Sequence, residues 1–203
     1  AAWGGHKGGC AARRSGAGVT GLSVEGFGEE EACAWLQSTV RQWRGDETGV
    51  LELVQHIGCL PLAVGQVSAF ASTHKTATAG EYLAELKRAA PTAAVEEEGL
   101  RKGARVECTP ILCAVVKLSM GAIRESKDGD GKAAEEAMRK MALCEITGIP
   151  LELLGSEERQ GVKLLSQHAL VTKDDKGLVA MHALTQRAVR GLRGQRVLAP
   201  RVG

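Results

Sequence analysis

Apolar residues recur at steps of three and four along most of this chain, and this spacing constrains its fold more than any other feature. In an early segment the recurring positions are Ala32, Leu36, Val40 and Trp43. In the middle of the chain they are Leu112, Val116, Met120 and Ile123. Each set lies on one face of a helix, so that one face can be buried while the other meets water. The sequence therefore predicts a mostly α protein built from packed amphipathic helices.

Start and stop signals divide the first half of the chain into four expected helices. Three glutamates at residues 29–31 favour a helix start, because acidic side chains are stabilised at a helix N-terminus. A second helix is expected around residues 49–57. A glycine break then precedes Pro61, which suits the first position of a third helix. Thr78 is the expected cap of a fourth.

The second half begins with another start signal, Thr109 followed by Pro110, and a loop is expected at residues 128–131. The helix after this loop has four apolar residues on one face, and they are Ala134, Ala137, Met138 and Met141. A stripe of this kind is typical of a packed core. Pro150 then begins a short helix over residues 151–154.

The final segment predicts a winged helix. A helix is expected over residues 157–168, and two short strands at residues 169–172 and 178–181 flank a polar turn. A last helix carries Leu184, Ala188 and Leu192 at four-residue steps. The fold class is therefore mostly α, a helical bundle segment followed by a winged helix with a small β-hairpin.

The expected domain organisation follows from these elements. Residues 1–19 are rich in Gly, Ala and Arg without apolar periodicity, and we expect a disordered tail there. The four-helix segment occupies residues 20–90, and a charged linker occupies residues 91–108. The helix pair and the winged helix occupy residues 109–199. The chain does not begin with Met, so we expect a fragment or a processed product.

Charge and cysteine content exclude several classes of protein. A net charge of +2 gives no reason to expect nucleic acid, and no apolar run is long enough to span a membrane. The six cysteines include no pair with the spacing of zinc ligands or redox dithiols. We therefore expect free structural thiols and a cytoplasmic protein. Counting twelve residues from Asp128 ends on Arg139 instead of glutamate, which argues against a calcium loop and leaves no expected metal site.

Four motifs occur in the order typical of one protein family. Residues 58–63 (GCLPLA) are similar to its GLPLA motif, and residues 149–154 (IPLELL) resemble the start of its winged helix. Residues 165–171 (LSQHALV) and 181–184 (MHAL) match its helix, strand and MHD-like box. Together with VEGF at residues 24–27, these motifs resemble NB-ARC proteins of the STAND class of nucleotide switches. The similarity is greatest to forms that carry tetratricopeptide repeats.

The resemblance implies a nucleotide site with two residues of this chain. Pro61 would pack near the adenine base, and His182 would reach the β-phosphate of bound ADP. An imidazole N–H to a phosphate is a charge-assisted hydrogen bond, which contributes about 1.5–3 kcal/mol. Such a contact would favour an ADP-bound state that ATP exchange releases. A nucleotide-binding core and tetratricopeptide repeats are the partners that the resemblance implies.

The sequence departs from the family in the parts that carry catalysis. No Gly-x-x-x-x-Gly-Lys-Ser/Thr occurs, and no hydrophobic strand ending in paired acids precedes residue 24. The third position of the MHD-like box is Ala183 instead of Asp. We therefore expect no enzymatic activity, and only weak ADP or ATP binding by this chain alone.

Other interpretations stay open at this point. Pro61 also fits a plain helix start, and His182 fits an interior histidine that caps the last helix. The whole chain could be a helical protein-interaction module. A DNA-binding winged helix is disfavoured, because the segment at residues 157–163 carries as many acids as bases. His56, His74 and His168 are expected at the surface or at helix ends, and Cys59 needs no nucleophilic role.

Overall fold

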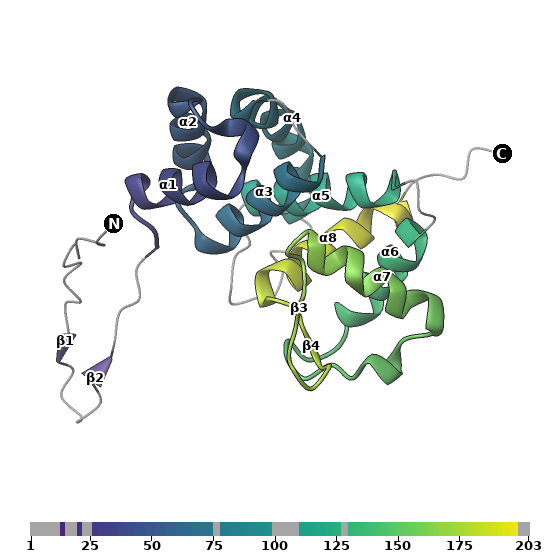
Figure 1. Cartoon of the computed structure of the whole chain (residues 1–203). Helices are drawn as coiled ribbons and strands as arrows, with labels where there is room; N and C mark the ends of the chain where they lie inside the picture. Colours follow the sequence, from purple (N-terminus) through teal and green to yellow (C-terminus); the bar gives the residue numbers. More distant parts are fainter. Residues whose placement is uncertain are drawn as a thin grey trace.

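A computed structural model describes residues 13–14, 20–21, 26–74, 78–98, 110–126 and 130–198. Within these residues the protein is mostly α with small β-hairpins, as the sequence predicts. Figure 1 shows the first helices gathered on one side, the β3–β4 hairpin on the other, and α5 and α8 between them. Among the described helices, none combines the length and apolar character that crossing a bilayer requires.

The first half of the described chain contains four α-helices and a short 3₁₀-helix. These elements are α1 (Glu29–Thr39), η1 (Arg41–Trp43), α2 (Glu47–Ile57), α3 (Pro61–His74) and α4 (Ala79–Glu98). Pro61 is the first residue of α3, as predicted. The strand β1 (Arg13–Arg14) lies in the range predicted to be a disordered tail, and it pairs with β2 (Thr20–Gly21) just beyond that range. The rest of residues 1–19 lies outside the described residues.

The second half contains four more helices and a second hairpin. Its elements are α5 (Pro110–Arg124), α6 (Asp130–Met141), η2 (Leu151–Leu153), α7 (Ser156–Gln167), β3 (Thr172–Lys173), β4 (Val179–Ala180) and α8 (Ala183–Leu198). The order α7, hairpin, α8 is the one predicted. The predicted linker differs, since α4 continues to Glu98 and only the remainder of that range lies outside the described residues.

Side-chain caps explain where α2 and α4 begin. Asp46 Oδ1 accepts a hydrogen bond from Gly49 N at 3.0 Å, so α2 starts two residues before the predicted position. The second oxygen of Asp46 accepts from Ala79 N at 3.1 Å, which ties the starts of α2 and α4 together. Thr78 Oγ1 accepts from Glu81 N at 3.1 Å, so the predicted cap of α4 is confirmed.

The apolar stripes predicted from spacing in α1 with η1, in α5 and in α6 lie in one continuous core. Ala32, Leu36, Val40 and Trp43 have no exposed surface, and the stripe of α5 is at most 5% exposed. Small aliphatic side chains fill most of this core, and the large rings are concentrated beside Tyr82. The Tyr82 ring lies 5.1 Å from Phe70 and 6.2 Å from Trp43. The two halves of the chain therefore share one hydrophobic interior.

Helix α8 joins the halves through buried polar contacts. Gln66 Nε2 of α3 donates to Thr185 Oγ1 of α8 at 3.1 Å, and both residues are fully buried. The next residue, Gln186, donates to the carbonyl oxygens of Met141, Cys144 and Glu145 at 3.1–3.3 Å. These carbonyls lie at and just after the end of α6, where backbone carbonyl groups have no hydrogen-bond donor within the helix.

Helices α6 and α7 cross at a glycine. A Cβ added to Gly161 of α7 would lie 2.5 Å from Ala134 Cα of α6, far inside van der Waals contact. Val162 and Leu165 of α7 are buried beside this crossing, with exposed fractions of 3% and 0%. The close approach of the two backbones therefore requires glycine at position 161.

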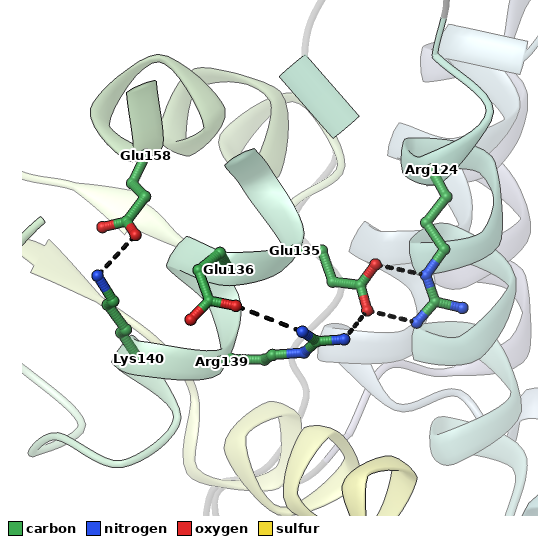
Figure 2. A network of polar contacts seen from close by, with 6 residues as sticks. All are labelled: Arg124, Glu135, Glu136, Arg139, Lys140 and Glu158. Atoms are coloured by element: carbon green, nitrogen blue, oxygen red, sulfur yellow. Dashed lines mark hydrogen bonds and ion pairs between the residues drawn. The ribbon is translucent and has the colours of Figure 1, made fainter. Parts of the chain in front are cut away.

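An ion-pair network links α5, α6 and α7 (Figure 2). Arg124 of α5 makes two hydrogen bonds of 2.8 Å to the carboxylate of Glu135, which also pairs with Arg139 on its own helix. This bidentate pairing raises the pKa of Arg124. Lys140 donates to Glu158 of α7 at 2.6 Å, and Gly155 N donates to the other oxygen of the same carboxylate. These two hydrogen bonds lower the pKa of Glu158.

The small hairpin extends by one bridge into the segment before η2. Thr172 pairs with Ala180, and Val179 exchanges two backbone hydrogen bonds of 2.9 Å with Ile149. The turn is closed by Asp174, whose Oδ1 accepts from the backbone N–H groups of Lys176 and Leu178. The structure thus has strands shorter than predicted, and a third segment completes the sheet.

His168 lies at the end of α7, one of the two positions expected for it. It is only 1% exposed, so it belongs to the interior and not to the surface. Residues of α3, far away in sequence, cover its ring, and the nearest is His74 with ring centroids 5.1 Å apart. Burial, and secondarily His74, lower the pKa of His168 from 6.5 to about 4.

We predict that Gly161→Ala destabilises the protein by about 1–3 kcal/mol, because the added methyl group overpacks the α6–α7 crossing. Gly65→Ala is the matched control, since a Cβ there meets nothing within 4 Å in α3. That substitution should stabilise the protein by about 0.5–1 kcal/mol. Urea denaturation followed by circular dichroism measures both. Equal effects of the two substitutions would contradict the close crossing.

We also predict an acid-dependent loss of stability. Burial lowers the pKa of His56 as well, so His56 adds a loss below pH 6.5, but the larger share is expected from His168, whose pKa is shifted further. Because its pKa is lower in the folded state, the unfolded chain takes up the proton first. The free energy of unfolding should therefore fall by about 1 kcal/mol per pH unit as pH drops from 6.5 to about 4. Glu158 adds its own loss only near and below pH 4.5. His168→Gln should reduce the pH dependence of the free energy of unfolding between pH 6.5 and about 4. An unchanged slope in this variant would contradict the assignment to His168.

Candidate functional site

A small cavity lies where the N-terminus of α3 meets the start of α8. Its volume is about 360 Å³. Leu62 comes from the first turn of α3, and His182 directly precedes α8. The remaining lining residues are Ile146, Thr147, Ala169, Leu170, Val171, Thr172, Ala180, Met181 and Ala183. The cavity thus brings together segments that are about 120 residues apart in sequence.

Pro61, the first residue predicted to contact nucleotide, is exposed and stands next to the cavity residue Leu62. The turn before Pro61 contains two residues in the left-handed conformation, Gly58 with φ of 71° and Cys59 with φ of 53°. This turn sets the position of Pro61. Cys59 O accepts a hydrogen bond from Phe27 N at 3.2 Å, which holds this turn against the start of α1. The structure places Pro61 at the rim of the cavity instead of among its lining residues.

His182, the second predicted residue, lines the cavity and caps α8. Its Nδ1 accepts a hydrogen bond from Leu184 N at 3.2 Å, and its carbonyl oxygen accepts from Gln186 N at 3.0 Å. A backbone N–H can only donate, so Nδ1 carries no proton in the neutral ring. The proton is therefore on Nε2, which becomes a hydrogen-bond donor on an exposed side chain.

The chemistry of the cavity is mainly apolar. Among the described residues that line it, the polar side chains are those of Thr147, Thr172 and His182. The positive ends of α3 and α8 are the other polar features nearby. The arrangement suits a flat apolar group with one hydrogen-bond acceptor at its edge. In the described part of the chain, no three metal-ligating side chains cluster to hold a metal ion.

The thiols near this region have the properties of structural cysteines. Cys33 of α1 and Cys59 are free and half-buried. Burial raises the pKa of both thiols, with further increases from the charge of Glu29 and, for Cys33, from Cys59. A raised pKa disfavours the reactive thiolate.

Two features of the site escaped the sequence interpretation. The first is the contribution of residues 169–172, which were expected only as a strand. Ala169 has a left-handed φ of 52° that turns the chain from α7 into the cavity wall. The second is Ile146, a 45% exposed apolar residue that lines the cavity from the segment after α6. No periodic signal marks either segment, since both lie between helices.

The three other histidines that the structure describes lie away from this cavity. His56 is half-buried in α2, where burial and then Lys87 lower its pKa. His74 is exposed at the end of α3, as expected, and His168 is buried against it. Neither ring lines the cavity of His182, and together they form a separate cluster with Phe70.

Comparison with protein-family models finds no match to this chain, and a search of curated proteins finds none either. The resemblance to NB-ARC proteins therefore rests on the motifs themselves and on the place that two of them, residues 58–63 and 181–184, occupy around one cavity.

Proposed function

We propose that this chain is the regulatory C-terminal part of an NB-ARC switch of the STAND class, which binds ADP together with a nucleotide core and is not itself catalytic. The observation that carries this proposal is the cavity at the junction of α3 and α8. It joins Leu62 of the GLPLA-like motif to His182 of the MHD-like box. Two motifs with no covalent reason to meet therefore contribute to one surface.

The hydrogen bonding of His182 supports the role that the resemblance gives it. Because Nδ1 is occupied by Leu184 N–H, the exposed face of the ring presents an Nε2–H donor. A phosphate oxygen is a strong acceptor for such a donor. The adjacent apolar wall, with Leu62 and Ile146, suits the face of an adenine base.

The small size of the cavity is the reason why the proposal includes a nucleotide-binding core as a partner. One donor and a volume of about 360 Å³ supply a small part of the contacts that a nucleoside diphosphate makes. A nucleotide-binding core would supply the cations and the backbone N–H groups that hold phosphates. In this proposal tetratricopeptide repeats carry the signal onward, and the free thiols match a cytoplasmic setting.

A helical protein-interaction module is the second candidate function. The observation in its favour is the apolar character of the surface around the cavity. Ile146 at 45% and Leu60 at 36% are large exposed apolar side chains, one lining the cavity and one two residues before Leu62. A DNA-binding winged helix has less support, since Arg159 of α7 donates to Leu154 O and Glu158 pairs with Lys140.

We predict that His182→Asn weakens ADP binding while leaving stability unchanged. Asparagine is a good helix cap, so it retains the acceptor for Leu184 N–H but lacks the imidazole Nε2–H. The loss of one charge-assisted hydrogen bond should lower ADP affinity about tenfold or more. Calorimetry measures this on the chain alone and on a longer form that includes the sequence preceding it in its gene.

The outcomes separate the two candidate functions. Tighter ADP binding by the longer form, reduced by His182→Asn, supports the switch. His182→Ala is the control for the cap, because it removes both the donor and the cap and should lower stability by about 1 kcal/mol. Absence of ADP binding by the longer form, or full binding by His182→Asn, would leave the protein-interaction module.

A further inference from the structure

A second site lies where α3 and α7 end side by side. His74 is the last residue of α3, and His168 directly follows α7. Their ring centroids are 5.1 Å apart, and the ring planes make an angle of 54°. The His74 ring also stacks on Phe70 at 4.6 Å and 16°, which fixes its orientation. Two imidazoles from distant parts of the sequence therefore face one place.

The hydroxyl of Thr73 determines which nitrogen of His74 is free. Thr73 Oγ1 donates its proton to a carbonyl oxygen of the preceding turn, with Ala69 O and Phe70 O both at 2.9 Å. It therefore accepts from His74, whose Nδ1 lies 3.0 Å away. Nδ1 thus carries the proton, and Nε2 keeps its lone pair. This is how a hydroxyl or carbonyl orients a metal-binding histidine in known metal sites.

His168 supplies the second imidazole, and this residue is only 1% exposed. Its Nδ1 is buried and has no hydrogen-bond partner among the described residues. A buried polar atom without a partner costs free energy, and a bound ion is one way to recover it. Neutral imidazole is also the form that binds metal ions.

The separation of the rings matches two imidazoles on one metal ion. A Zn–N bond is about 2.0–2.1 Å, and a ring centroid lies about 1.1 Å behind the nitrogen. At a tetrahedral angle, two such ligands place their centroids about 5 Å apart. The observed centroid distance of 5.1 Å is close to this value. The spacing of the two rings is therefore compatible with a shared ion.

We propose that His74 and His168 form a binding site for a divalent transition-metal ion of the Zn²⁺, Cu²⁺ or Ni²⁺ type. The two rings line a cavity of about 860 Å³ that also contains the side chains of Glu125 and Gln167. In the described residues no third histidine, cysteine or carboxylate is close enough to complete a metal cluster. Water or an external ligand fills the remaining positions, and the ion holds the end of α3 against the end of α7.

Nickel is the probe for this proposal. The free thiols, including Cys33 and Cys59, are first alkylated so that they do not compete for the ion. Ni²⁺ is then titrated by calorimetry, and the paramagnetic broadening of the five histidine ring signals is followed by NMR. We expect one Ni²⁺ per chain, with broadening of the His74 and His168 signals before the other three.

Three variants locate the site. Thr73→Val removes the acceptor that orients His74 and should weaken Ni²⁺ binding about tenfold. His74→Gln removes an exposed ligand, leaves the core intact and should weaken binding more than Thr73→Val does. His56→Gln is the matched control, because it removes a histidine of α2 outside the site and should leave binding unchanged. Melting curves without metal verify that each variant is folded.

Several results would overturn the site. They are no Ni²⁺ binding below about 1 mM, equal broadening of all five histidines, and equal effects of His74→Gln and His56→Gln. None of these measurements involves nucleotide, so the metal site stands or fails independently of ADP binding.

Discussion

The hydrogen bond between Gln66 and Thr185 is the contact on which the rest of the structure depends. It is a buried polar link between α3 and α8, and it lies inside a core that is mostly apolar. A hydrogen bond contributes only about 1 kcal/mol net, but leaving both groups unpaired in that core would cost several times more. A shift of α8 along α3 would break this bond, so the contact favours the observed arrangement of the two halves.

The geometry of the candidate nucleotide site depends on how α3 and α8 are placed against each other by the Gln66–Thr185 hydrogen bond. Leu62 lies one helical turn before Gln66 on α3, and His182 lies three residues before Thr185 at the start of α8. The two walls of the cavity are therefore held by a bond one turn deeper in the structure. Gln186 fixes the third wall, because it binds the carbonyl oxygens that precede Ile146. In this structure a polar core contact defines the shape of an apolar cavity.

The sequence predicts helices well wherever the signal is local. Pro61, Thr78 and the apolar stripe of α5 determine their elements through contacts within a few residues, and the structure agrees with them. The helix-end position of His168 agrees with the prediction, but its burial was not predicted, because it depends on packing beside Phe70 and His74 of α3 and no local pattern reports such a contact. The same limit applies to the cavity. The motifs indicated Pro61 and His182, but Ile146 and residues 169–172 join them only through the tertiary packing.

The distance between Gln66 and Thr185 along the chain has a consequence for how the protein is made. They are separated by 119 residues, so α3 leaves the ribosome well before its partner helix is made. Contacts of such long range are slow to form, because a large loop has to close first. Until then, the helices of the first half present an incomplete core and an unpaired amide to the cell. The nascent chain is consequently most exposed to aggregation, and most dependent on chaperones, just before α8 appears.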